Sequence, residues 1–200
     1  MVSHVSGHMG GVNSRALDLL GICKETVDPD GGKIGRGADG RPDGYLEERA
    51  FIQCSEKIPQ PSLEEQLGLL KKAQEIYFSY GITTIQDGKT GNAEFTLLKK
   101  AAERNMLSAD VVAYADMASC PELLHENPLY CSNYRDRLKL GGYKLFLDGS
   151  PQGKTAWMET PYRKGSDGYC GYPAMQDKEL YGYLSRAVDE RMQIMAHANG

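Results

Sequence analysis

From residue 62 onward the sequence alternates between helical and strand-like segments, and this alternation limits the fold more than any other feature. Strands are predicted at 81–87, 109–116, 143–148 and 193–198. Helices are predicted at 62–81, 92–105 and 177–192, with short helical pieces broken by Pro128 within 120–142. Because two parallel strands need a crossover connection, strands separated by helices of this length form a parallel sheet. The sequence therefore predicts an α/β fold.

The parallel sheet could belong to a barrel or to an open, doubly wound fold. A dinucleotide-binding open sheet should carry G-x-G-x-x-G between its first strand and the following helix. After the strand at 81–87 the sequence reads GKTGNAEF, whose two glycines lack that spacing. We therefore favour a (β/α) barrel, or part of one, over the open sheet.

Residues 1–60 have a different character. The segment SRALDLLGIC predicts a short helix, and residues 28–48 are so rich in Gly, Asp and Pro that they predict turns and a β-hairpin. A calcium loop starting at Asp39 fails, because Arg41 and Ala50 stand where the EF-hand pattern requires oxygen ligands. We expect a turn-rich insertion at 1–60 and the α/β part at 61–200.

The composition argues against several classes of partner. The net charge is -4 and the sequence has no basic run, so no nucleic-acid partner is expected. No apolar stretch approaches the roughly 20 residues that cross a bilayer, and no signal-peptide pattern is present, so no membrane partner is expected. The 5 cysteines are widely spaced, which argues against a disulfide framework or a thiolate zinc site. We expect a cytoplasmic protein with reduced thiols.

The predicted strands end in residues that can carry chemistry. Asp87, Asp116 and Asp148 end three of them, and His197 lies near the end of the fourth. In an α/β barrel, the C-terminal ends of the strands form the active site. An aspartate after a strand can instead cap a helix or form a turn, and a histidine there can be a hydrogen-bonded core residue. Both interpretations stay open at this point.

Lys144 is the most informative of these residues. Side chains alternate along a strand, so Lys144, Phe146 and Asp148 share the face that would line a barrel. A lysine pointing inward is costly unless it is paired or chemically changed. It could form an ion pair with Asp148, it could be carboxylated by carbon dioxide and bind metal, or its amine could reach water at the rim.

Four blocks resemble one known family. In order along the chain they are HVSGHMGGVNSRAL, GITTIQDG, KLFLDGSPQGKTAWMETPY and AHANG. Together they resemble the amidohydrolase superfamily, and within it the amidohydrolase-3-type metal-dependent hydrolases, a branch that hydrolyses N-substituted formamides and related amides. The match covers nearly the whole chain, and DGSPQGKTA and SGHMGGVNS are its most specific parts.

The resemblance implies a (β/α)8 TIM-type barrel and a set of site residues. The four predicted strands correspond to strands two to five of that barrel. Lys144 then occupies the bridging position of strand four, as a carboxylated lysine, and His197 occupies the metal-ligand position of strand five. His8, Asn13 and Asp148 are expected to contact the substrate.

The resemblance also implies ligands that these residues do not contain. The family pattern has an H-x-H pair on strand one, a histidine on strand six and an aspartate on strand eight. We therefore expect an internal fragment of a longer chain, a partial barrel at 61–200 that is inactive alone. Its open sheet edges favour a homo-oligomer.

The function implied is hydrolysis of a C–N bond in a small amide-type substrate. One or two divalent ions, zinc in the family, would activate water for this reaction. Two alternatives remain: a non-catalytic α/β ligand-binding or regulatory module, and a barrel enzyme that forms a Schiff base at Lys144. The sequence does not indicate the substrate or the number of metal ions.

Overall fold

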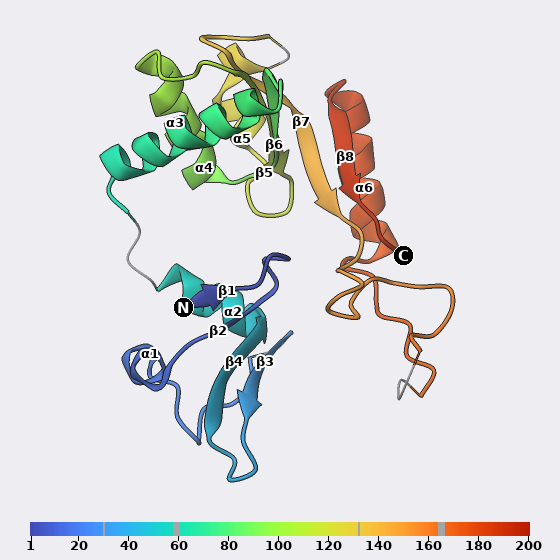
Figure 1. Cartoon of the computed structure of the whole chain (residues 1–200). Coiled ribbons are helices and arrows are strands. Elements are labelled where there is room, and N and C mark those ends of the chain that lie inside the picture. The colour runs from blue at the N-terminus through green and yellow to red at the C-terminus, as the bar shows by residue number, and fades with distance from the viewer. Residues whose placement is uncertain (30, 58–60, 132, 164–166) are drawn as a thin grey trace. The chain divides into compact units, whose positions relative to one another are not determined.

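The computed structural model describes residues 1–29, 31–57, 61–131, 133–163 and 167–200. The chain forms two compact units, Met1–Gln60 and Pro61–Gly200. Each unit has its own sheet and its own apolar core (Figure 1). We call them the first and the second unit and describe each by itself.

The first unit is a small antiparallel sheet with two helices. Its elements are β1 (Val2–Ser3), β2 (Met9–Gly11), α1 (Ser14–Leu20), β3 (Gly32–Arg36), β4 (Pro42–Glu48) and α2 (Arg49–Glu56). The strand order is β1-β2-β4-β3, and every neighbouring pair is antiparallel. The predicted hairpin is the pair β3–β4, and the predicted short helix is α1. Sequence reasoning missed β1, β2 and α2, and Phe51 of α2 lies in the core with Leu46 of β4.

The second unit contains a parallel sheet with helical connections. Its elements are α3 (Leu63–Ser79), β5 (Thr84–Thr90), α4 (Asn92–Glu103), β6 (Asp110–Asp116), α5 (Leu123–Glu126), the 3-10 turn η1 (Pro128–Tyr130), β7 (Leu138–Phe146), α6 (Asp177–Asp189) and β8 (Gln193–His197). The strand order is β5-β6-β7-β8, and all three pairings are parallel. The α/β prediction is confirmed.

Both ends of α3 show why the helix forms there. Ser62 accepts a hydrogen bond from the Glu65 N–H, and the Glu65 carboxylate accepts one from the Ser62 N–H at 2.8 Å. This capping box satisfies N–H groups that have no partner within the helix. At the other end Gly81 has φ +75, a conformation that favours glycine and ends the helical segment.

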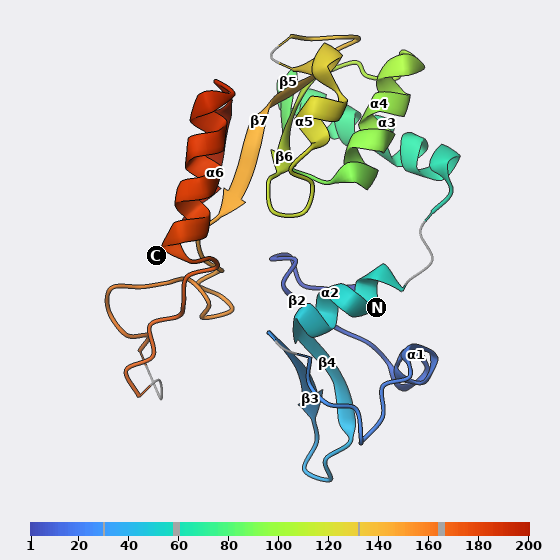
Figure 2. The same ribbon diagram turned by 180° about the vertical axis from the view of Figure 1, so that it is seen from behind.

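The helices of the second unit share one apolar core with one face of the sheet. The helices contribute Leu67 from α3, Phe95 from α4, Leu124 from α5 and Ala187 from α6. The strands contribute Val111, Ala113, Ala115, Leu138, Leu140, Tyr143 and Leu145. These strand residues lie on the face opposite to Lys144. Val111, Ala113 and Ala115 alternate along β6, and their partners across the register shift in β7 are Leu138, Leu140 and Tyr143. Figures 1 and 2 show the helices gathered around the sheet.

Two strand boundaries differ from the prediction. Strand β7 begins at Leu138 rather than at residue 143, so it includes the glycine pair at 141–142. Gly142 has φ +151, and a Cβ there would overlap the backbone carbonyl of Gln193, so glycine permits the close approach of β7 and β8. Strand β7 also ends at Phe146, which places Asp148 two residues beyond it.

Strand β5 is displaced in the opposite direction, toward the C-terminus. It runs from Thr84 to Thr90, so Asp87 lies inside the strand and not at its end. The register with β6 shifts between Asp87 and Thr90, and the Thr90 hydroxyl donates to Asp87 Oδ2 at 2.8 Å. This irregularity lets the strand continue through Gly88. Across the described ranges, no helix is both long and apolar enough to cross a membrane.

A buried polar side chain, Gln74 of α3, connects the helix to the loop before β6. Gln74 is 2% exposed. Its Oε1 accepts from the Ser108 N–H at 2.7 Å and the Ala109 N–H at 3.1 Å, and its Nε2 donates to the Met106 carbonyl at 3.1 Å. The side chain thus satisfies backbone groups that neither helix nor sheet can pair.

Replacing Gln74 with alanine should therefore destabilise the second unit. Gln74→Ala leaves buried N–H groups unpaired, which lowers the free energy of unfolding by about 2 kcal/mol. Urea denaturation followed by circular dichroism measures this change. Glu75→Ala, an exposed neighbour on α3, is the control and should change stability by less than about 0.5 kcal/mol. Equal effects of the two substitutions would contradict the assigned role of Gln74.

Candidate functional site

Lys144 and His197 lie on the same face of the parallel sheet. In the register of β7 and β8, Lys144 pairs with Met195 and Phe146 pairs with His197. Residues two apart on a strand share a face, and so do register partners on neighbouring strands. Lys144, Phe146 and His197 therefore project from the face without helices, close to the C-terminal ends of β7 and β8.

The amine of Lys144 is buried beside an aromatic ring. Lys144 is 9% exposed, and its Nζ lies 4.8 Å from the centre of the Phe146 ring. Burial lowers the pKa of Lys144, and the nearby Asp116 carboxylate offsets only part of this effect. The environment thus shifts Lys144 toward the neutral amine, the form with a lone pair that can react with an electrophile such as carbon dioxide.

The ion pair considered between Lys144 and Asp148 does not form within the described residues. Two other charged groups lie near Phe146 and Lys144: Asp116, one of the predicted strand-end aspartates, and Lys89, which the sequence analysis did not single out. The Lys89 Nζ lies 5.2 Å from the centre of the Phe146 ring and 4.0 Å from Asp116 Oδ2, and its side chain is 61% exposed. Asp116 itself accepts from the Ser119 hydroxyl at 2.9 Å, the arrangement expected of a turn-forming aspartate.

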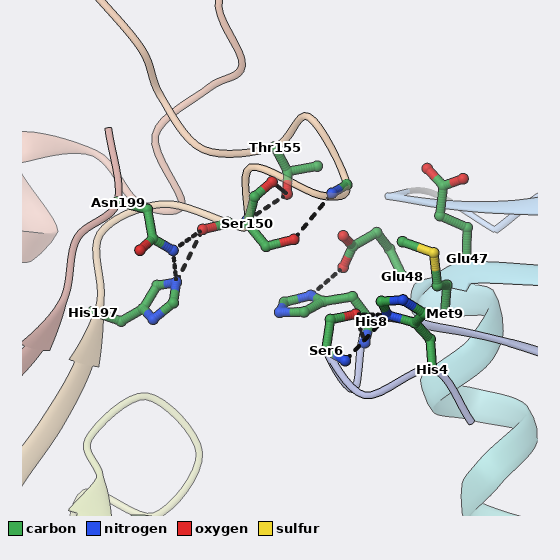
Figure 3. A network of polar contacts seen from close by, with 12 residues as sticks. His4, Ser6, His8, Met9, Glu47, Glu48, Ser150, Thr155, His197 and Asn199 are labelled. Atoms are coloured by element: carbon green, nitrogen blue, oxygen red, sulfur yellow. Dashed lines mark hydrogen bonds and ion pairs between the residues drawn. The ribbon is translucent and has the colours of Figure 1, made fainter.

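The imidazole of His197 is hydrogen-bonded through Nε2 (Figure 3). This nitrogen lies 2.9 Å from the carbonyl oxygen of Gly149 and 2.8 Å from Asn199 Nδ2. The Gly149 carbonyl can only accept and the Asn199 Nδ2 can only donate, so the tautomer of His197 decides which of the two contacts is a hydrogen bond. In either tautomer Nε2 could bind a metal only once its hydrogen bond opens. The ring also packs against Phe146, with centroids 5.3 Å apart.

Asp148 joins the end of β7 to the segment after β8. Its carboxylate is buried, with the residue 5% exposed. It accepts from the N–H groups of Trp157 at 3.0 Å, Asn199 at 2.9 Å and Gly200 at 2.6 Å. Burial raises the pKa of Asp148, but these three N–H groups, aided by the charge of His197, outweigh it and hold the pKa below its usual value. The Asp148 carboxylate is therefore ionised, and both of its oxygens accept hydrogen bonds from backbone N–H groups.

The loop that follows Asp148 is held together by its own hydroxyl groups. The Ser150 N–H donates to the Thr155 hydroxyl oxygen at 2.9 Å, and the Ser150 hydroxyl accepts from the Gly153 N–H at 3.1 Å. A Cβ on Gly149 would overlap the Thr155 side chain, so glycine is needed there. This arrangement explains the block DGSPQGKTA: its residues place the Gly149 carbonyl against the His197 ring.

The two remaining predicted site residues belong to the first unit. Asn13 caps α1, where its Oδ1 accepts from the Ala16 N–H at 3.0 Å. His8 is partly buried, and its Nδ1 lies 3.0 Å from Glu48 Oε2 (Figure 3). The structure thus gathers Lys144, Asp148 and His197 in the second unit and places His8 and Asn13 in the first.

Glu48 was missed by sequence reasoning, and its backbone is strained. It has φ 49 and ψ -122, a region that glycine prefers and that costs about 1–3 kcal/mol for another residue. Its N–H donates to the His8 carbonyl at 2.7 Å. In the sequence two glutamates follow Leu46, but nothing in this pattern indicates that either of them contacts His8.

The donor set for a metal is incomplete within the described residues. They contain no group of three or more His, Cys, Asp or Glu side chains placed to hold an ion. Lys144 and His197 supply two donors, whereas a catalytic zinc usually takes three protein ligands. These residues fit part of a metal site and do not form a whole one.

The comparisons with known proteins decide the family. Residues 1–200 match the Amidohydrolase family. The chain belongs to this family. The predicted resemblance is thereby confirmed.

Individual relatives agree with this assignment. The chain is 27% identical to the putative amidohydrolase YtcJ of Bacillus subtilis over 100% of its own length and 38% of that protein. It is 31% identical to the N-substituted formamide deformylase of Arthrobacter pascens over 48% of its own length and 18% of that enzyme. The crystal structure of an uncharacterized metal-dependent hydrolase from Pyrococcus horikoshii aligns with a TM-score of 0.68 and 23% identity, covering 96% of this chain and 38% of that one. The chain thus spans less than two fifths of these relatives' lengths.

Removing the Asp148 carboxylate should loosen both segments that it joins. Asp148→Ala leaves three N–H groups without their acceptor and lowers the free energy of unfolding by about 3 kcal/mol. Hydrogen exchange followed by NMR should show faster exchange at the amides of Trp157 and Asn199. Asp189→Ala, at an exposed carboxylate of α6, is the control. Unchanged protection of both amides in Asp148→Ala would contradict the role given to Asp148.

Proposed function

We propose that this chain is part of a metal-dependent hydrolase that cleaves C–N bonds in small amide-type molecules. The observation that carries the proposal is the shared face of Lys144 and His197 on neighbouring parallel strands, in a chain of the amidohydrolase family. The printed name of one relative, N-substituted formamide deformylase, supports an amide-type substrate. We propose further that the chain acts within a longer protein, because its relatives are more than twice its length.

The proposal includes a partial (β/α)8 barrel. Strands β5 to β8 would be strands two to five of that barrel, and residues 1–60 would be an insertion. What supports this is the single core of the second unit: all its helices pack on one face of the sheet. A doubly wound open sheet carries helices on both faces, whereas the sheet of a barrel carries them only outside.

Within that barrel, Lys144 and His197 would hold a divalent ion, zinc being our proposal. Lys144 would do so as a carboxylate after reaction with carbon dioxide, which its buried amine favours. The ion would polarise the substrate carbonyl and activate water. The further ligands would come from other parts of the longer protein.

The proposal gives the remaining residues separate roles. His8 would contact the substrate, since one of its ring nitrogens is not needed for the Glu48 contact. Asn13 and Asp148 were also predicted to contact the substrate, and that stays a prediction, because the structure shows their oxygens engaged with backbone N–H groups. The other predicted features, a homo-oligomer and a cytoplasmic location, remain proposals.

One alternative has a specific observation in its favour. The Nε2 of His197 is engaged by the Gly149 carbonyl or the Asn199 amide, and the described residues supply only two metal donors. Both facts would suit a non-catalytic α/β module that binds a small ligand without a metal. Metal analysis of the longer protein, purified without chelators, separates the two functions: less than stoichiometric zinc together with ligand binding would favour the module.

The two proposed ligands should control metal content. In the longer protein, Lys144→Ala and His197→Ala should each lose most of the bound zinc measured by elemental analysis. Lys139→Ala, on the same strand but with its amine over the Tyr134 ring, is the matched control and should keep it. Full zinc occupancy in Lys144→Ala would contradict the assignment of Lys144.

The isolated 200-residue chain should bind zinc weakly and hydrolyse no amide. With two donors in place of three, it should not retain a stoichiometric ion through gel filtration. Calorimetric titration with zinc measures the affinity, and an amine-release assay with N-substituted formamides measures hydrolysis. Tight zinc binding and turnover by this chain alone would show that the described residues suffice for the site.

A further inference from the structure

We propose that Glu48 is a positioning residue that holds the proton of His8 on Nδ1 and thereby presents Nε2 as a hydrogen-bond acceptor to a ligand. The ligand class that fits is one with an N–H donor, such as a secondary amide or an amine. The inference rests on the proposed function in one respect, the assignment of His8 as a substrate contact.

The carboxylate determines the tautomer of His8. Glu48 Oε2 lies 3.0 Å from His8 Nδ1, and an ionised carboxylate oxygen only accepts hydrogen bonds. The shared proton therefore belongs to Nδ1. In the neutral ring the other nitrogen, Nε2, then carries a lone pair, and Figure 3 shows it on the side of the ring away from Glu48.

A second hydrogen bond fixes the geometry of the pair. The Glu48 N–H donates to the His8 carbonyl at 2.7 Å, so Glu48 contacts both the backbone and the ring of His8. Both side chains are partly buried, His8 at 28% and Glu48 at 19% exposure. A carboxylate that holds one nitrogen of an imidazole orients the ring for whatever binds the other nitrogen.

The unusual backbone conformation of Glu48 indicates that its side chain has a role. Glycine would suit φ 49 and ψ -122 better, yet a glutamate stands there. An outlier of this kind persists when the surroundings hold it in place, and it motivates a hypothesis of function. The carboxylate on His8 is the contact that glycine could not provide.

His4 shows the opposite arrangement and serves as an internal reference. Its Nδ1 accepts from the Ser6 N–H at 3.1 Å, which requires a lone pair on Nδ1 and places the proton of the neutral ring on Nε2. His4 and His8, four residues apart, should therefore carry their protons on different nitrogens.

The test is NMR of the imidazole nitrogens in the whole 200-residue chain, at a pH where the rings are neutral. We expect His8 to show a protonated Nδ1 and an unprotonated Nε2, and His4 the reverse. In Glu48→Gly, which suits the backbone conformation and should fold, the Nδ1–H signal of His8 should be lost in favour of Nε2–H. An Nε2–H tautomer of His8 in the unaltered chain, or an unchanged His8 in Glu48→Gly, would overturn the proposal.

The matched control is the neighbouring glutamate. Glu47 accepts from the Tyr45 hydroxyl at 2.8 Å and makes no contact with His8 in the described structure. Glu47→Ala should leave the His8 tautomer unchanged. A change equal to that of Glu48→Gly would show that the effect is general to the strand and would overturn the specific role of Glu48.

The ligand class is tested with two small amides. Titration with N-methylacetamide, which has an N–H, should shift the Nε2 resonance of His8, whereas N,N-dimethylacetamide, which has none, should not. Equal shifts would overturn the donor preference. Because neither measurement uses metal or turnover, failure of the proposed hydrolase function would leave the tautomer result standing, and the converse also holds.

Discussion

The second unit depends on burial of one face of a parallel sheet. Tyr143 and Leu145 of β7 lie in the apolar core with residues of the helices, while the alternate residues Lys144 and Phe146 face away from that core. A hydrophobic core on one side leaves the other side available for polar groups, and this is where Lys144 and His197 project. The stabilising interaction and the candidate chemistry thus use opposite faces of the same strands.

Asp148 connects that sheet to its loops. An ionised carboxylate in a buried place is costly unless it is hydrogen-bonded, and three backbone N–H groups from two separate segments compensate for the cost here. The same junction brings the Gly149 carbonyl to the His197 ring. The hydrogen-bonded junction at Asp148 and Gly149 therefore holds the segment after β8 and also orients His197, the proposed metal ligand.

Much of the fold could be predicted from the sequence, because the helical and strand periods differ and each is set by the residues themselves. The parallel sheet, the face shared by Lys144 and His197 and the capping box at Ser62 all follow from local pattern. The strand boundaries did not follow. Gly142 lies inside β7, and its close approach to Gln193 of β8 is a contact between strands that no local pattern shows.

By itself the sequence determined the α/β class, the face that Lys144 and Phe146 share on β7 and, through its motif blocks, the amidohydrolase family. Only the tertiary structure decided which groups meet: Glu48 with His8, three N–H groups with Asp148, and the Gly149 carbonyl with His197. The physical reason is the distance along the sequence over which each kind of interaction acts. Periodicity and capping act within a few residues. Apart from the Trp157 contact, which spans 9 positions, these contacts join residues 40 to 52 positions apart, and chain folding alone brings them within hydrogen-bonding distance.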